Sequence, residues 1–399
     1  MIQLLKSLSL NNHIFFVTLV FISFIFLSFR EPDKSPSFNK CECKTAPSDL
    51  NLSTGKDQVA LLVIRDAFKS LKPEINQYKS DVEANFPVQL HIIKGSWVKP
   101  EEVRATIIEL YNKKNISGVV LVGAIPMHRF FMHDFPNPNP LFYEAFDLKF
   151  VDNNGDGISD AYIGRPDLRV WVANLRGVEN DADQGIEILK TFFQKTHKYY
   201  SGKVKIEKKV LAVTASDWPE GANDFAAQYG RPIFGPDNVI TLGPERTTKE
   251  NILSVFKDNN FSMFYIQVHS GASSQRTANG ILYSKEIAEI NTGALFTINH
   301  GCSTCNWEKA ALESERNTGM SWVFGKSIGE AIVCNVRTGM VYGQDSIYSR
   351  IMDGDYLGKA YFEGKKAAEL EMFNEYPSGE IVSGVTFIGN PFIYIQKKK

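Results

Sequence analysis

Two apolar runs in the second half of the chain constrain its fold most strongly. Residues 261–269 read FSMFYIQVH and residues 294–302 read ALFTINHGC, and Ser and Gly follow or interrupt both. Runs of this length, rich in β-branched and aromatic residues, are typical of buried strands. The 32 residues between His269 and Cys302 leave room for the crossover connection that parallel strands require. If the strands are neighbours, His269 and Cys302 emerge side by side at the carboxyl edge of the sheet, where open α/β sheets bind ligands.

A wider alternation of strand-like and helix-like segments supports a parallel sheet. Strands are expected at 58–64, 88–94, 118–123, 169–175, 209–215, 329–336 and 385–395, and helices at 65–85, 100–114, 181–200, 249–259 and 357–373. This spacing predicts a doubly wound α/β fold. The pattern breaks at 127–141, where prolines and asparagines predict a loop that borders a crevice. A division near Gly202 separates an N-terminal α/β subdomain, 58–202, from a C-terminal one, 203–399.

Composition excludes one class of partner. The 399 residues are 43% apolar and 22% charged, with a net charge of −1. This is an ordinary globular balance without a basic excess, so we expect no nucleic-acid partner.

The N-terminal segment indicates export. No charged residue occurs between Lys6 and Arg30, and residues 14–29 are almost wholly apolar. As a helix this run would span about 24 Å, slightly less than the ~30 Å core of a bilayer. Residues 1–30 are therefore expected to be a signal peptide or a membrane anchor, with the main domain secreted or held outside the cytoplasm. Residues 31–57, which include Cys41 and Cys43, are expected to form a linker.

Cys302 and His269 form the sharpest chemical pair. A thiolate is a strong nucleophile, and a neighbouring imidazole can activate it and then protonate a leaving amine. Backbone N–H groups near Gly271 are candidates for holding the oxyanion. The pair predicts a cysteine peptidase that acts on a peptide or protein substrate. The plain alternative is a core cysteine near a hydrogen-bonded histidine.

Cys305 leaves two further alternatives open. The Cys302-x-x-Cys305 spacing after a strand is that of a thiol–disulfide exchange motif. Together with His269 and His300, the two cysteines could instead bind zinc.

A second motif, DNNGDGISD at 152–160, is typical of calcium loops. Asp152, Asn154, Asp156 and Asp160 supply oxygen ligands at suitable spacing, and we predict a structural Ca²⁺ there. The twelfth position is Ile163 rather than Glu, so the loop is not a complete EF-hand. An Asx-rich turn without an ion is the alternative.

From residue 58 to residue 395, the order of several motifs resembles the gingipain-type cysteine peptidases of the caspase-like group. The motifs are GVVLVGAIP at 118, the 152–160 loop before AYIGRPDLRVWVANLRG, FGKSIGEA at 324 and FIGNPFIYI at the end, with the blocks ending in His269 and Cys302. The resemblance implies a caspase-like α/β/α fold of parallel sheets flanked by helices in two similar halves.

The same resemblance implies a role for each residue of the pair. His269 would be the general base and acid and Cys302 the nucleophile. The residue of the specificity pocket does not carry over from the family, and Asp147 is a candidate acidic contributor to it. Ser270 follows His269 where many members have Gly, and the family motif does not require Cys305. An inactive exported binding or structural protein on the same fold is therefore the alternative.

Overall fold

The computed structural model describes residues 55–132, 135–177, 182–257, 259–312, 316–339, 344–375 and 384–396. The chain divides into two units, residues 1–52 and 53–399, and all described residues belong to the second. The expected signal or anchor segment and nearly all of the expected linker lie outside the described residues. Within the described ranges, no helix combines the length and the apolar character needed to cross a bilayer.

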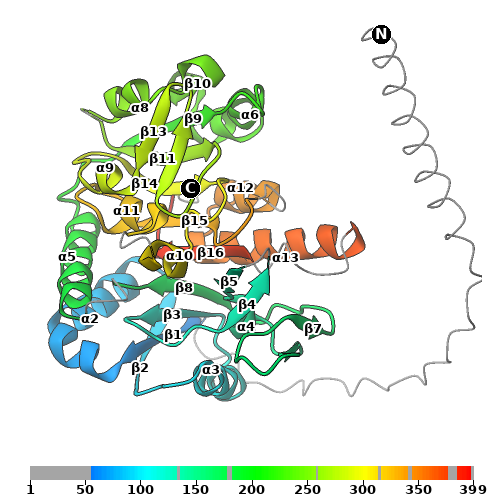
Figure 1. Ribbon diagram of the computed structural model, residues 1–399. Helices are drawn as coiled ribbons and strands as arrows, with labels where there is room; N and C mark the ends of the chain where they lie inside the picture. The colour runs from blue at the N-terminus through cyan, green and yellow to red at the C-terminus, as the bar shows by residue number, and fades with distance from the viewer. Residues whose placement is uncertain are drawn as a thin grey trace, which may run out of the picture. The chain divides into compact units, whose positions relative to one another are not determined.

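A single sheet built from ten of the described strands forms the centre of the second unit (Figure 1). Its order is β10-β9-β11-β14-β15-β16-β8-β3-β1-β2. The strands are β1 (Asp57–Ile64), β2 (Val88–Gly95), β3 (Gly118–Val122), β8 (Trp171–Leu175), β9 (Glu207–Thr214), β10 (Val239–Leu242), β11 (Phe261–Gln267), β14 (Ala294–Asn299), β15 (Ala331–Asn335) and β16 (Val385–Gly389).

The sheet consists of two parallel blocks that run in opposite directions. Strands β10, β9, β11, β14 and β15 are mutually parallel, and so are β16, β8, β3, β1 and β2. The blocks meet where β15 pairs antiparallel with β16. A mostly parallel sheet flanked by helices was expected and is confirmed. The division near Gly202 stays a prediction, because β16 comes from the C-terminal part of the chain but lies in the N-terminal block.

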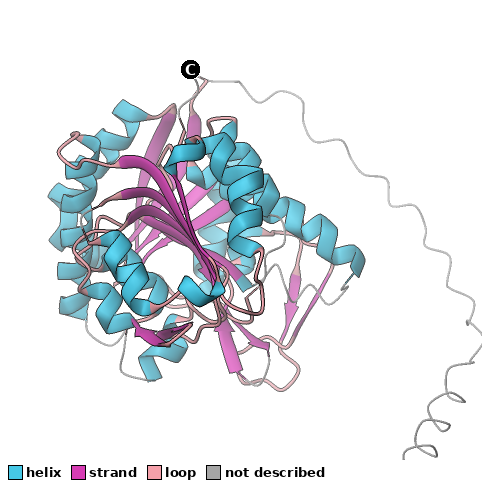
Figure 2. Ribbon diagram, turned by 90° about the horizontal axis from the view of Figure 1, so that it is seen from above, coloured by secondary structure: helices cyan, strands magenta, loops and turns pink. Residues whose placement is uncertain are grey.

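Helices cover both faces of the sheet (Figure 2). On one face α2, α5 and α11 pack in succession, and on the other α12 packs against α13. The described helices of three or more turns include α2 (Arg65–Asn85), α3 (Pro100–Lys114), α5 (Ala182–Tyr200) and α13 (Leu357–Glu375), with shorter α8 (Lys249–Phe256), α11 (Thr318–Phe324) and α12 (Gln344–Met352). In α2, Leu71, Ile75, Tyr78 and Val82 are buried at helical spacing, which explains its packing.

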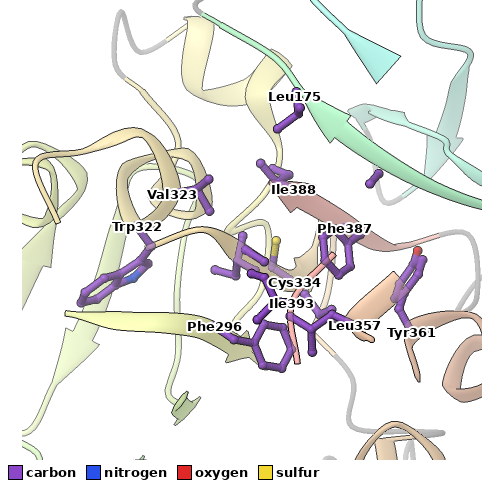
Figure 3. Close-up of a cluster of buried hydrophobic side chains, with 14 of the residues drawn as sticks. Leu175, Phe296, Trp322, Val323, Cys334, Leu357, Tyr361, Phe387, Ile388 and Ile393 are labelled. Carbon is purple, nitrogen blue, oxygen red and sulfur yellow. The ribbon is translucent and has the colours of Figure 1, made fainter. Parts of the chain in front are cut away.

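A shared apolar core joins the two blocks (Figure 3). Phe296 from β14 and Ile388 from β16 are fully buried there, as are Val323 of α11 and Leu357 of α13. Burying a side chain of this size contributes roughly 1.5–3 kcal/mol. The core therefore spans the antiparallel junction and stabilises the ten strands as one sheet.

The loop expected at 127–141 is partly wrong. Arg129–Met132 (β4) and Phe135–Pro138 (β5) pair as antiparallel strands. Prolines normally weaken a strand prediction because they cannot donate to the ladder, but a short two-stranded ribbon exposes its edges and tolerates them.

Candidate active site

The structure places His269 and Cys302 on adjoining segments at one edge of the sheet. Strands β11 and β14 are parallel neighbours, with Ile266 opposite Asn299, so both residues follow carboxyl ends. The segments also touch, because a Cβ built on Gly301 would lie 2.0 Å from Ser270 Oγ. Only glycine fits at this position without a shift, and its absence of a side chain lets the two turns approach each other.

A sharp turn presents Cys302. The next residue, Ser303, has φ 56°, in the left-handed region that non-glycine residues rarely adopt. Its N–H donates to Arg337 O at 2.6 Å, and the N–H of Gly339 donates to Cys302 Sγ at 3.3 Å. The segment that follows β15 therefore holds both the turn and the sulfur. Such local strain often accompanies a functional residue.

Asp217 is the partner of His269. It follows β9, which lies beside β11, and its carboxylate is hydrogen-bonded to His269 Nε2. This bond is the first cause of the lowered pKa of Asp217. The indole of Trp218 covers the imidazole, with ring centroids 4.9 Å apart. Asp217 and Trp218 thus orient the imidazole of His269, whose side chain is 46% exposed.

Sequence reasoning missed Asp217, although a signal was present. Polar residues Ser216 and Asp217 follow a predicted strand, just as His269 and Cys302 do. The order of strands in the sheet decides whether such residues meet, and that order depends on contacts far apart in the chain.

Gly271 requires a correction. Its N–H donates to Ser274 O at 2.9 Å, inside the loop that follows His269. This amide is therefore engaged and does not point at a substrate oxygen. In the part of the chain that the structure describes, the N–H of Cys302 donates no hydrogen bond and is the better oxyanion candidate.

Cys305 is bonded to Cys334, with a Cα–Cα distance of 5.8 Å. Both cysteines are buried, and Cys302 is the free cysteine of the described residues. Exchange between Cys302 and Cys305 therefore has no structural support. Among the described residues, no group of three or more His, Cys, Asp or Glu side chains is placed to bind a metal, so the zinc alternative has none either.

The predicted calcium loop connects β6 (Lys149–Val151) to β7 (Ala161–Ile163). Asp152 accepts the N–H groups of Gly155 and Gly157 at 2.7 and 2.8 Å, and Asn154 and Asp156 accept backbone N–H groups in the same manner. Asp160 accepts the N–H of Asn153. All of these bonds lie within the loop, those of Asn154 and Asp156 have Asx-turn spacing, and the described residues contain no converging carboxylate cluster. Calcium binding stays a prediction.

An acid-lined aromatic cavity of about 210 Å³ opens beside the pair, and we call it the acidic pocket. Gln267 and His300 line it, two residues before His269 and Cys302 respectively. Its other lining residues are Gly221, Asp224, Phe225, Gln228, Tyr229, Tyr265, Asp345 and Tyr348. Asp147, the residue expected at a specificity pocket, instead pairs with Arg169 at 3.0 Å and does not line this cavity.

Two further hollows flank His269. One, of about 440 Å³, is lined by Asp217 and Glu245, and the other, of about 560 Å³, by Ser270 and Ile281. His269, Arg276, Thr277 and Ala278 line both. His269 therefore lies where these two hollows adjoin, while Gln267, two residues before it, lines the acidic pocket.

Comparisons with known proteins identify no family. No family model and no curated protein matches the chain. A Saccharomyces cerevisiae separase–securin complex is similar at 11% identity and TM-score 0.35, over 57% of this chain and 16% of that chain. An ABC transporter, LacI family transcriptional regulator from Brachyspira murdochii, is 10% identical with TM-score 0.17, over 85% of this chain and 96% of that one. TM-scores this low establish neither a shared fold nor a function.

Proposed function

We propose that this chain is a cysteine endopeptidase with Cys302 as nucleophile and His269 as general base and acid. The observation that carries the proposal is a free thiol on a strained turn, in contact with the segment whose imidazole Asp217 orients. Thiol, imidazole and orienting carboxylate are the three roles of a nucleophilic site.

The reaction follows from these roles. The Cys302 sulfur bonds to the scissile carbonyl carbon while its proton passes to His269. The tetrahedral oxyanion accepts the N–H of Cys302. His269 then returns the proton to the departing amine as the C–N bond breaks, which leaves a thioester on Cys302. Water, deprotonated by the same imidazole, hydrolyses the thioester and restores the thiol.

The acidic pocket suits a basic side chain on the acyl side of the scissile bond. Burial, and then the carboxylate of Asp345, raise the pKa of Tyr229 to about 12. Burial followed by the charge of Asp224 raises the pKa of Tyr265. Both carboxylates therefore act on the aromatic walls, and a negative, ring-lined cavity attracts a guanidinium or ammonium group.

Alkylation tests the nucleophile. We expect iodoacetamide at neutral pH to label Cys302 faster than an unperturbed thiol and to abolish hydrolysis. The Cys302→Ala variant should lose both the fast labelling and the hydrolysis, while the Cys41→Ala/Cys43→Ala double variant should retain both. If Cys302 reacts no faster than a free thiol and Cys302→Ala still hydrolyses peptides, the proposal is wrong. No cleavage of a peptide library by the wild type would favour an inactive binding protein.

Charge removal tests the pocket. Asp224→Asn and Asp345→Asn should each lower kcat/KM for substrates with Lys or Arg before the scissile bond by about 10-fold, the worth of a hydrogen bond to a charged group. Alanyl substrates should be unaffected. Asp237→Asn, at an exposed carboxylate outside the pocket, is the matched control. Equal losses for basic and neutral substrates would contradict the assignment.

We also propose export, with the apolar segment at 14–29 as signal or anchor. The buried Cys305–Cys334 disulfide supports an oxidising compartment. Protease treatment of whole cells tests this location, because a main domain outside the cytoplasm should be cleaved.

A calcium ion bound at Asp152–Asp160 would stabilise the N-terminal subdomain without taking part in the chemistry. We expect calcium at about ten times its Kd to stabilise the wild type by about 1.4 kcal/mol. Thermal unfolding with and without calcium, compared with Asp152→Ala, measures the effect. An identical response of the two proteins would count against the site.

A further inference from the structure

The hollows on the far side of His269 are not used by the proposed mechanism. We infer that Arg276 selects substrates with an acidic side chain in the leaving part, after the scissile bond. The inference rests on the proposed function and adds a second specificity determinant to the acidic pocket.

Arg276 has a fixed position relative to the imidazole. It lies on β12 (Ser274–Thr277), which pairs antiparallel with β13 (Gly280–Tyr283). Its N–H donates to His269 O at 2.8 Å, so the ribbon is bonded directly to the histidine backbone. At the other end, Ala278 N–H donates to Thr247 O at 2.9 Å. The exposed guanidinium therefore projects from an anchored strand that adjoins the site.

The direction of the substrate follows from the chemistry. His269 protonates the leaving amine, so the chain after the scissile bond begins at the imidazole. The side chain before the bond occupies the acidic pocket, whose lining includes His300, near Cys302. The departing residues must then extend over the two hollows that His269 and Arg276 share.

Charge distinguishes the two hollows. In the larger one, Arg276 is the charged lining residue, and the imidazole of His269 and the hydroxyls of Ser270 and Ser274 lie with it. The smaller hollow adds the carboxylates of Asp217 and Glu245. An acidic side chain is therefore attracted to the larger hollow and repelled by the smaller. A guanidinium can bind a carboxylate through two parallel hydrogen bonds, which makes the contact selective.

Two substrate types separate this inference from the proposed function. The first is a basic peptide whose leaving group is aminomethylcoumarin, so that no residue follows the scissile bond. The second is a peptide pair with Glu or Gln at the first or second position after the bond. We expect wild type to cleave the Glu peptide about 10-fold better, by kcat/KM. Arg276→Gln should reduce this ratio to about one and leave coumarin release unchanged.

Charge reversal and a control variant complete the test. Arg276→Glu should prefer Lys over Gln at the same position, while Arg231→Gln, at an exposed arginine that lines neither hollow, should behave as wild type. A wild type that releases coumarin but does not distinguish Glu from Gln overturns the inference alone. An equal loss of coumarin release and peptide cleavage in Arg276→Gln also overturns it. Failure of the wild type on every substrate overturns the proposed function with it.

Discussion

The Asp217 carboxylate and His269 Nε2 are hydrogen-bonded, although 52 residues separate them in the chain. The bond links the carboxyl ends of β9 and β11, and Cys302 follows β14, the next strand across. Three adjacent parallel strands thus supply a carboxylate, an imidazole and a thiol in chain order. Each strand contributes one of the three groups to the same edge of the sheet.

Replacing Asp217 should slow the reaction without abolishing it. We expect Asp217→Asn to lower kcat/KM by about 10- to 100-fold, less than the ~10⁴-fold loss at a buried triad aspartate, because this pair is partly exposed. The pKa of Asp217 is lowered mainly by His269, so its contribution is present above its ordinary pKa and is lost only as pH falls through the lowered value. Asp217 therefore stays ionised between pH 5 and 8, so the loss measured over this range reports the missing charge rather than protonation of Asp217. Asp237→Asn, at an exposed carboxylate that lines none of the three cavities, is the control.

The contact between Gly301 and Ser270 should be essential for the site. Gly301→Ala places a Cβ 2.0 Å from Ser270 Oγ and 2.6 Å from Ser270 Cβ, which forces the two turns apart. We expect hydrolysis to fall at least 10-fold, as happens when reacting groups are misplaced by about 1 Å. Ser270→Gly removes the clashing atoms, so the double variant should recover activity. If the double variant is no better than Gly301→Ala, the contact does not set the geometry.

The disulfide beneath the turn should stabilise the fold. Cys305 and Cys334 are 29 residues apart, and closing a loop of that length contributes about 3.6 kcal/mol. Cys305→Ala/Cys334→Ala should therefore lower the free energy of unfolding by about that amount in urea titrations. The double variant should still be alkylated at Cys302 and should still hydrolyse peptides. A protein that worked by thiol–disulfide exchange through Cys305 would lose its activity. An unchanged urea midpoint would show that the bond does not contribute.

The contribution of Glu330 to stability should fall as pH rises from about 5 to 7. Burial raises the pKa of Glu330 to about 7 from 4.5, although Lys195 lowers it. A raised carboxyl pKa means that the folded chain binds the proton more tightly, so the stabilising contribution is present below 4.5 and is lost as pH passes 7. The Glu330 contribution alone should decrease by on the order of 2 kcal/mol over this interval, which is the difference expected between wild type and Glu330→Gln. Glu330→Gln should show a flatter dependence in thermal unfolding.

The order of local elements could be predicted from the sequence. Residues 58–64 and 65–85 were expected as strand and helix and form β1 and α2, because the change from a continuous apolar run to helical spacing is visible locally. The carboxyl-edge rule likewise placed His269 and Cys302 near each other, since β11 and β14 are parallel neighbours.

Features set by long-range pairing could not be predicted. The antiparallel junction between β15 and β16 depends on how two apolar runs pack. An apolar run by itself does not show whether its strand will pair parallel or antiparallel with a neighbour. The partner of Cys305 is Cys334 because α11 and β15 bring both sulfurs into one buried layer, whereas sequence spacing favoured Cys302. The role of Gly271 depended on a hydrogen bond to Ser274 that no residue pattern shows.

The buried Cys305–Cys334 disulfide and the partly exposed thiol of Cys302 place opposite requirements on the redox state of the surroundings. In the proposed mechanism Cys302 attacks a substrate only as a reduced thiolate, so oxidants that reach Cys302 would inactivate the site. Cys305 and Cys334 support the turn only while they form their buried disulfide, so reductants strong enough to break it would loosen the same site. Activity should therefore peak at an intermediate redox poise and fall on either side. An assay saturated with dithiothreitol, as is common for thiol enzymes, would underestimate the activity of this protein.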